Sequence, residues 1–234
     1  APSIFFSRKM VRASETGLKE GSLPPHWLVP RRDTGGEERL ARSLTVSPLM
    51  AHLLLRRGLG TPEEAQNFLF PDDGQLAVYR KIPEIDRAVQ RLTDALNKKE
   101  RVLFYGDYDV DGITGTAQLI SFFREAGLPP LAHLPHRERE GYGLNIDSLK
   151  KILKQSKPDL IVTIDNGTNA LQEISFLKEN GVDVIVIDHH ESPKERPPVV
   201  ALLNPKRRDA PCELPVASAG LVYLLLISLR AELR

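Results

Sequence analysis

The chain has 234 residues, of which 41% are hydrophobic, enough for one large domain or for a domain with an appendage. Its 32 lysines and arginines nearly balance 31 aspartates and glutamates, so the formal charge of +1 excludes a strong overall basic field for nucleic acid. The single cysteine, Cys212, excludes an internal disulfide and is typical of a reducing compartment. The longest uncharged run, Leu214–Leu229, contains a proline near its start and favours a buried helix over a membrane span. We therefore expect a soluble, cytoplasmic protein.

The first hundred residues predict an appendage rather than the main fold. Residues 1–30 mix serine, glycine and lysine and end in a proline-rich stretch, so we expect them to be poorly structured. Residues 31–100 are expected to form a helical lead-in. Ser47–Pro48 supplies an N-cap and a first-turn proline for one helix, and Thr61 opens another. Within Ile85–Leu96, apolar residues recur at helical spacing and predict a further helix of the same lead-in.

From residue 101 the pattern changes to alternating strands and helices, which we assign to one domain over residues 101–234. Apolar runs predict buried strands, namely Val102–Tyr105, Leu160–Ile164, Val182–Ile187, Val199–Leu203 and a weaker one at Pro130–Leu134. Helices are expected between them, at Thr114–Ala126, Ile146–Gln155 and Ala170–Glu179. Near-continuous apolar strands separated by helices predict an α/β fold with a parallel sheet covered by helices on both faces.

An acidic loop follows the first of these strands. Asp107, Asp109 and Asp111 alternate along it, and the loop ends at Gly112, ahead of a helix. In a βαβ unit this loop lies at the carboxyl end of the strand, where open α/β sheets bind ligands. Three carboxylates repel one another unless a cation lies between them, and hard divalent cations take carboxylate oxygens. An aspartate-rich turn that caps a helix explains the loop equally well.

Two further predicted strands also end in polar motifs. Asp165–Gly167 follows Leu160–Ile164, and Asp188–His190 follows Val182–Ile187. Taken alone, the first motif is explained by a turn and the second by a core histidine. Because the carboxyl ends of parallel strands meet at one edge of a sheet, three such motifs together favour a metal site.

The ligand types indicate the chemistry of this site. Aspartate and histidine without nearby cysteine favour Mn²⁺ or Mg²⁺ over a structural zinc, and so acidic a cluster can hold two ions with one bridging carboxylate. A two-metal site activates water and stabilises the charge that develops on a phosphoryl group. Backbone N–H groups of the helix that starts near Gly112–Thr114 would add donors for a phosphate oxygen. The residues therefore predict hydrolysis of phosphodiesters or phosphoanhydrides.

The three motifs, Asp107–Gly112, Asp165–Gly167 and Asp188–His190, resemble those of the DHH phosphoesterase family. The likeness is closest to the exonuclease branch of that family, which digests single-stranded DNA in the 5′→3′ direction in DNA repair and recombination. It covers residues 25–234 and extends through three further segments, namely Leu53–Asp72, Pro135–Asn145 and Ala201–Asp209. The resemblance implies single-stranded DNA as the substrate, no membrane partner, and single-strand-binding or helicase proteins as partners.

The resemblance also implies a role for each matching residue. The implied metal ligands are Asp109, Asp111, Asp165, His189 and His190. Asp165 is the candidate bridge between two Mn²⁺ or Mg²⁺ ions, while Asp107 and Asp188 would orient ligands or the attacking water. His189 or His190 would alternatively contact the phosphate. Gly112, Thr114 and Arg137 would contact the substrate phosphate, and the alternative for Arg137 is a surface salt bridge with Glu138 or Glu140.

The chain departs from the family pattern at two places. Val216–Gly220 reads VASAG, with Ser218 and Ala219 where the family shows a second glycine. The chain also ends at Arg234, before the family's second domain, so we expect a catalytic core. Whether this core is active by itself is left open. Two alternatives remain: an oligonucleotide or cyclic-dinucleotide phosphodiesterase of the same superfamily, and a non-catalytic interaction module with a relic metal pocket. The helical lead-in argues against the first, and the intact motifs argue against the second.

Overall fold

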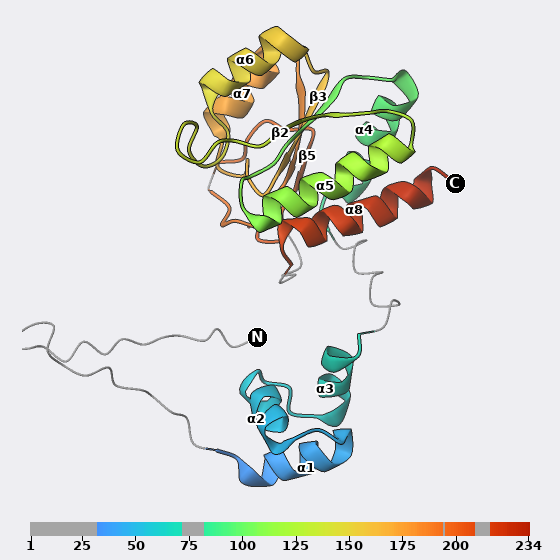
Figure 1. Cartoon of the computed structure of the whole chain (residues 1–234), viewed down its shortest axis with the longest axis vertical. Coiled ribbons are helices and arrows are strands. Elements are labelled where there is room, and N and C mark those ends of the chain that lie inside the picture. The colour runs from blue at the N-terminus through green and yellow to red at the C-terminus, as the bar shows by residue number, and fades with distance from the viewer. Residues whose placement is uncertain (1–31, 72–81, 194, 209–215) are drawn as a thin grey trace, which may run out of the picture. The chain divides into compact units, whose positions relative to one another are not determined.

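The computed structural model describes residues 32–71, 82–193, 195–208 and 216–234 (Figure 1). The chain divides into two compact units, residues 1–75 and 76–234, and each is described by itself. The segment 1–30, expected to be poorly structured, lies outside the described residues. None of the described helices is long and apolar enough to cross a membrane.

In its described residues, 32–71, the first unit contains three short helices around a small apolar core. They are α1 (Thr34–Leu44), α2 (Pro48–Arg56) and α3 (Pro62–Leu69). Ser47 accepts a hydrogen bond from a backbone N–H of α2, and Thr61 forms a reciprocal capping box with Glu64, as expected for these helix starts. Their apolar sides meet in a core of Leu40, Ala51, Leu54 and Ala65.

The second unit is built on a five-stranded, all-parallel sheet in the order β2-β1-β3-β4-β5. The strands are β1 (Val102–Tyr105), β2 (Leu131–His133), β3 (Leu160–Ile164), β4 (Asp183–Ile187) and β5 (Ala201–Leu203). All lie within the predicted apolar runs. Strands β1, β3 and β4 are neighbours in register, with Tyr105 beside Thr163 and Ile164 beside Ile187. The carboxyl ends of the three strands that carry polar motifs therefore meet at one edge.

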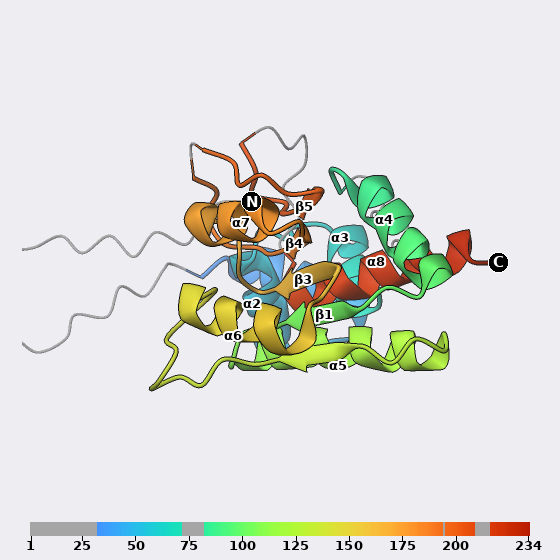
Figure 2. The same cartoon turned by 90° about the horizontal axis from the view of Figure 1, so that it is seen from above.

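Helices cover both faces of the sheet, which confirms the predicted fold class (Figures 1 and 2). One face is covered by α4 (Ile85–Lys98), α5 (Val110–Glu125) and α8 (Ser218–Glu232), and the other by α6 (Ile146–Ser156) and α7 (Leu171–Glu179). Alternate strand residues point to opposite faces, so Phe104 and Val162 pack in the first layer while Leu103 and Ile161 pack in the second. The strands whose ends form the polar edge are thus packed between two apolar cores.

Two elements differ from expectation. Helix α4, expected in the lead-in, belongs to the second unit, because its buried side chains, among them Val89 and Leu92, join the core beneath the sheet. The compact unit therefore extends ahead of residue 101 and includes α4. Helix α5 begins at Val110 rather than near Gly112–Thr114, because Asp109 already caps it.

Candidate metal centre

The acidic loop between β1 and α5 is folded tightly onto the start of its helix. Asp109 is the N-cap of α5, and its carboxylate accepts a hydrogen bond from the N–H of Gly112 at 3.0 Å. A Cβ at Gly112 would lie 2.4 Å from the backbone nitrogen of Asp107, so only glycine allows this approach. The close contact buries Asp107 beneath the loop while Asp109 stays exposed.

The loop after β3 places Asp165 at the centre of the edge. Its backbone adopts a left-handed conformation, with φ of 64°, which is uncommon outside glycine. Thr163 donates a hydrogen bond to the carbonyl of Asn166 at 2.9 Å, and Gly167 continues the turn with φ of 105°. Asp165 is 2% exposed, and the turn directs its carboxylate toward the other two loops.

The loop after β4 is organised around Asp188. One of its carboxylate oxygens accepts hydrogen bonds from the N–H groups of His189 and His190, at 2.7 and 3.2 Å, and lies 2.6 Å from Nδ1 of His190. The other accepts from the N–H of Thr168 at 3.0 Å. Asp188 therefore holds the His190 ring in place. The hydroxyl of Tyr142 also lies 3.2 Å from a nitrogen of the same ring.

Among the described residues, side chains from the three loops meet in two groups that share Asp165. The first group is Asp165, His189 and His190, and the second is Asp107, Asp109 and Asp165. Within each group the ligand atoms lie within 4.8 Å of one another. His189 Nε2 is 3.3 Å from Asp165 Oδ1 and 3.6 Å from Asp111 Oδ2, so the acidic loop also faces the histidines.

The electrostatics of the site favour a bound cation. Burial, together with the charges of Asp111 and Asp109, raises the pKa of Asp165 to about 7. The hydrogen bond from Ser218 acts to lower this pKa but is outweighed. Burial and the charge of Asp109 also raise the pKa of Asp107. One oxygen of Asp107 is buried and has no hydrogen-bond partner among the described residues. The repulsion among these carboxylates calls for a positive charge, and the oxygen and nitrogen donors fit a hard divalent ion.

On the histidine side of the site, a neighbouring carboxylate rather than burial decides the direction of the pKa shift. Burial lowers the pKa of His190, but the hydrogen bond and charge of Asp188 outweigh it, so the net pKa is raised. A carboxylate behind an imidazole also fixes which ring nitrogen faces outward. The orientation of the His190 ring is therefore fixed, as either a metal ligand or a phosphate contact requires.

Asp111 lies at the start of α8 as well as at the metal centre. Its carboxylate accepts hydrogen bonds from the N–H groups of Ser218 and Ala219, at 2.8 and 2.7 Å. The close backbone approach that the sequence VASAG leaves in question is therefore made by these two residues. Each carboxylate oxygen has two lone pairs, so Asp111 can cap α8 and still face a metal ion.

Arg137 lies at the rim of the site. Its guanidinium carbon is 5.6 Å from the ring centre of Tyr108, the residue that separates Asp107 and Asp109 in the acidic loop. Within the described part of the chain, Arg137 forms no salt bridge with Glu138 or Glu140. The alternative interpretation of Arg137 as a partner of either glutamate is therefore not what the structure shows.

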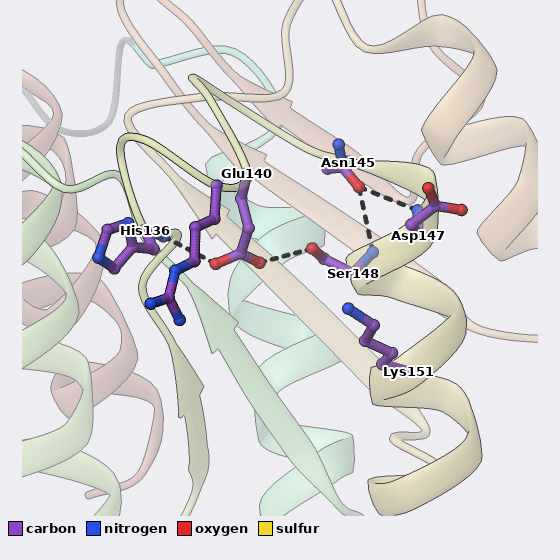
Figure 3. A pocket seen from close by; sticks show the side chains of 7 residues that line it. His136, Glu140, Asn145, Asp147, Ser148 and Lys151 are labelled. Carbon is purple, nitrogen blue, oxygen red and sulfur yellow. Dashed lines mark hydrogen bonds between the residues drawn. The ribbon is translucent and has the colours of Figure 1, made fainter.

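Glu140 fixes the segment that carries Arg137 to α6, beside a pocket of about 410 Å³ (Figure 3). Its carboxylate accepts from the N–H of His136 at 2.7 Å and from the hydroxyl of Ser148 at 2.5 Å, and it lies 3.0 Å from Nε2 of His133. Because the turn is tied at both ends, Arg137 is presented on a fixed support.

The groups of α5 that were expected to contact a phosphate form hydrogen bonds within the start of the helix instead. The N–H of Gly112 is bound to Asp109, and the hydroxyl of Thr114 donates to the carbonyl of Val110 at 2.6 Å. Two residues with site contacts were not predicted as site residues. The sequence marks Ser218 only as a departure from glycine and Tyr142 only as part of the matching segment Pro135–Asn145. Neither pattern shows that the side-chain hydroxyl reaches Asp165 or His190.

Comparisons with known proteins agree with the motifs. The model of the DHH family, N-terminal domain, matches residues 101–233. The chain is 34% identical over 210 residues to the single-stranded-DNA-specific exonuclease RecJ of Bacillus subtilis (strain 168), and the match covers 88% of this chain and 26% of that protein. The described fold is also similar to solved structures.

The crystal structure of RecJ in complex with Mn²⁺ from Thermus thermophilus matches with a TM-score of 0.66 and 30% identity, over 85% of this chain and 27% of that one. A crystal structure of exonuclease RecJ bound to manganese matches with a TM-score of 0.60 and 37% identity, over 65% of this chain and 38% of that one. The chain thus spans about a quarter to two fifths of the length of these relatives.

Proposed function

The chain belongs to the DHH family, and from this premise we propose that it is a metal-dependent phosphodiesterase, an exonuclease that digests single-stranded DNA in the 5′→3′ direction. The relatives at about one third identity are single-stranded-DNA-specific exonucleases, and two solved relatives hold manganese. The single observation that carries the proposal is the pair of ligand groups that share Asp165.

The shared carboxylate supports a two-ion site. Asp165 belongs to both groups, so it is the candidate bridge, with His189 and His190 on one side and Asp109 on the other. Mn²⁺ or Mg²⁺ bound there would activate a water molecule and neutralise charge on the phosphoryl group. Asp111 faces His189 and completes the proposed set of ligands.

The remaining residues are proposed to orient the reacting groups. Asp188 holds His190, and Asp107, a member of the second ligand group, contributes a buried oxygen that has no hydrogen-bond partner among the described residues. Arg137 at the rim would bind a phosphate of the incoming strand through its guanidinium. Gly112 packs closely against Asp107, and the hydroxyl of Thr114 donates to the carbonyl of Val110, so both residues are proposed to shape the start of α5 beside the site.

The substrate and partners follow from the family. Single-stranded DNA is the proposed substrate, and single-strand-binding proteins or helicases that expose such strands are the proposed partners. An enzyme that processes repair intermediates works where the DNA is, so we propose a cytoplasmic location.

The test is digestion of a labelled oligonucleotide by this chain with Mn²⁺. A 5′-labelled strand should release labelled mononucleotide at once, a 3′-labelled strand should shorten stepwise, and the matching duplex should be digested far more slowly. Asp165→Ala, or a chelator, should abolish the reaction. Cleavage confined to dinucleotides or cyclic dinucleotides would contradict the exonuclease assignment, and Mn²⁺-independent cleavage would contradict the site.

A further inference from the structure

The first turn of α8 lies against the acidic loop of the candidate metal centre. The N–H groups of Ser218 and Ala219 donate to Asp111, and Gln118 of α5 donates to the carbonyl of Ala219 at 3.2 Å. Helices α5 and α8 run side by side in Figures 1 and 2. They approach closely at Gly115. A Cβ there would lie 3.5 Å from Cα of Ala219. The start of α8 is therefore held in a fixed position beside the site.

The hydroxyl of Ser218 is directed away from its own helix. A serine at a helix start commonly accepts from N–H groups of that helix. In α8 the residue at the N-cap, Ala217, makes no side-chain bond, and Asp111 binds the free N–H groups instead. Ser218 is fully buried, and its hydroxyl donates to Oδ1 of Asp165 at 2.9 Å.

We propose that Ser218 is a positioning residue of the metal centre, whose hydroxyl fixes the Asp165 carboxylate in the orientation that serves both ligand groups. This inference rests on the proposed metal-dependent function and adds a residue to it. A carboxylate at the end of a short side chain turns about its terminal bond, and a donor on one oxygen selects one orientation. Oδ1 keeps a second lone pair, so the bond from Ser218 leaves it able to bind an ion.

The role is specific to the serine side chain. The backbone of residue 218 already caps Asp111, and a glycine there, as in the family pattern, would keep that contact but lose the hydroxyl. The position thus separates two contributions: the N–H supports Asp111 and the hydroxyl supports Asp165. Because Asp165 is shared by both groups, loss of the hydroxyl should weaken both ions rather than one.

The test is calorimetric titration with Mn²⁺ of the wild-type chain and four variants. Ser218→Ala removes the donor and keeps the Cβ, and Ser218→Gly is a second donor-free variant. Both should bind Mn²⁺ about tenfold more weakly, the range seen when a group that orients a metal ligand is lost. Ser218→Thr keeps a hydroxyl and should restore the affinity. Val216→Ala perturbs the same segment, partly buried against the core, and should bind as wild type does.

Thermal unfolding of each metal-free variant shows whether a loss of Mn²⁺ affinity comes from the site itself or from a destabilised fold. Wild-type affinity in Ser218→Ala and Ser218→Gly would overturn the inference. So would an equal loss in Val216→Ala, because the effect would then follow the packing of the segment. If the wild-type chain itself binds no Mn²⁺, the proposed function fails before the variants are compared.

Discussion

Asp165 is the residue that the two ligand groups share. It is nearly fully buried, it adopts a left-handed backbone conformation, and its pKa is raised to about 7, mainly by burial. Strained backbones and displaced pKa values in one residue cost stability, and such residues cluster at functional sites. The aspartate fits this turn better than most residues because short polar side chains tolerate positive φ.

Asp188 provides a test of how the histidines are held. Asp188→Asn keeps the shape of the side chain, but an amide cannot accept hydrogen bonds at both of its ends. Since Asp188 accepts bonds from His189, His190 and Thr168, the variant should leave His190 poorly oriented. We expect Mn²⁺ affinity to fall about tenfold in calorimetric titration.

The matched control for this variant is Asp147→Asn, which changes an exposed aspartate of α6 in the same way. It should bind Mn²⁺ as wild type does. Equal affinity in Asp188→Asn and wild type would show that His190 needs no support from the carboxylate.

At the residue scale, the convergence of the three motifs could be predicted, and the contacts that support their side chains could not. Because the carboxyl ends of parallel strands lie at one edge of a sheet, the positions of the motifs predict that Asp107, Asp165 and His189 lie along that edge. The contact of Ser218 with Asp165, and the capping of α8 by Asp111, depend on how a helix distant in the sequence packs. Local sequence carries no signal for such a contact.

At the scale of elements, the approach of α5 to α8 sets the geometry of the centre. Gly115 allows it: a Cβ there would lie 2.7 Å from Cγ2 of Ile164, at the end of β3. A buried branched side chain on a strand cannot yield easily to such a contact. The glycine therefore reflects packing rather than backbone freedom.

Gly115→Ala should consequently destabilise the second unit by about 1–3 kcal/mol, in spite of the better helix propensity of alanine. Urea unfolding followed by circular dichroism measures this. Gly35→Ala, at an exposed position of α1, is the control and should be neutral or slightly stabilising. A gain in stability in Gly115→Ala would show that the space around residue 115 accommodates a methyl group, and would contradict this account of the packing.

Glu84 connects α4 to β5 and carries a pH dependence. Its carboxylate binds the guanidinium of Arg196 through both oxygens, at 2.6 and 2.7 Å, and accepts from the N–H of Leu202 at 2.9 Å. Burial acts to raise its pKa, but these hydrogen bonds and the charge of Arg207 outweigh it and lower the pKa below 4.5. A carboxyl group with a lowered folded-state pKa stabilises the fold above its unfolded pKa, and this stabilisation is lost as the pH falls through the folded value.

Glu84→Gln should therefore lower the free energy of unfolding by about 2 kcal/mol at pH 7, and this difference from wild type should shrink below about pH 4.5. Urea unfolding at pH 7, 5 and 3 measures the difference. Glu125→Gln, an exposed position on α5, should show no such dependence. A cost that stays constant from pH 7 to pH 3 would assign the effect to shape rather than charge.

Helix α4 also shows where prediction from sequence stops at this scale. Its periodic apolar residues predict the helix, and its bounds agree within two residues at its end. They do not say what the apolar face packs against, because the same stripe fits a helical bundle or a sheet. Only tertiary structure places it beneath the sheet.

At the scale of the whole molecule, the layered architecture of the second unit follows from the apolar pattern of the chain. Continuous apolar runs separated by helices require a parallel sheet with two covered faces, and the two cores of the second unit are those faces. What the runs leave open is strand order. The order β2-β1-β3-β4-β5 makes the three motif-bearing strands neighbours, and only then do their loops meet.

The most direct test of the central claim is Mn²⁺ titration of the wild-type chain and Asp165→Ala, with circular dichroism to confirm that both fold. Because Asp165 belongs to both ligand groups, we predict two ions per wild-type chain and loss of both in the variant. The control Asp147→Ala should bind two. Retention of either ion at wild-type affinity in Asp165→Ala would contradict a centre built on a shared carboxylate.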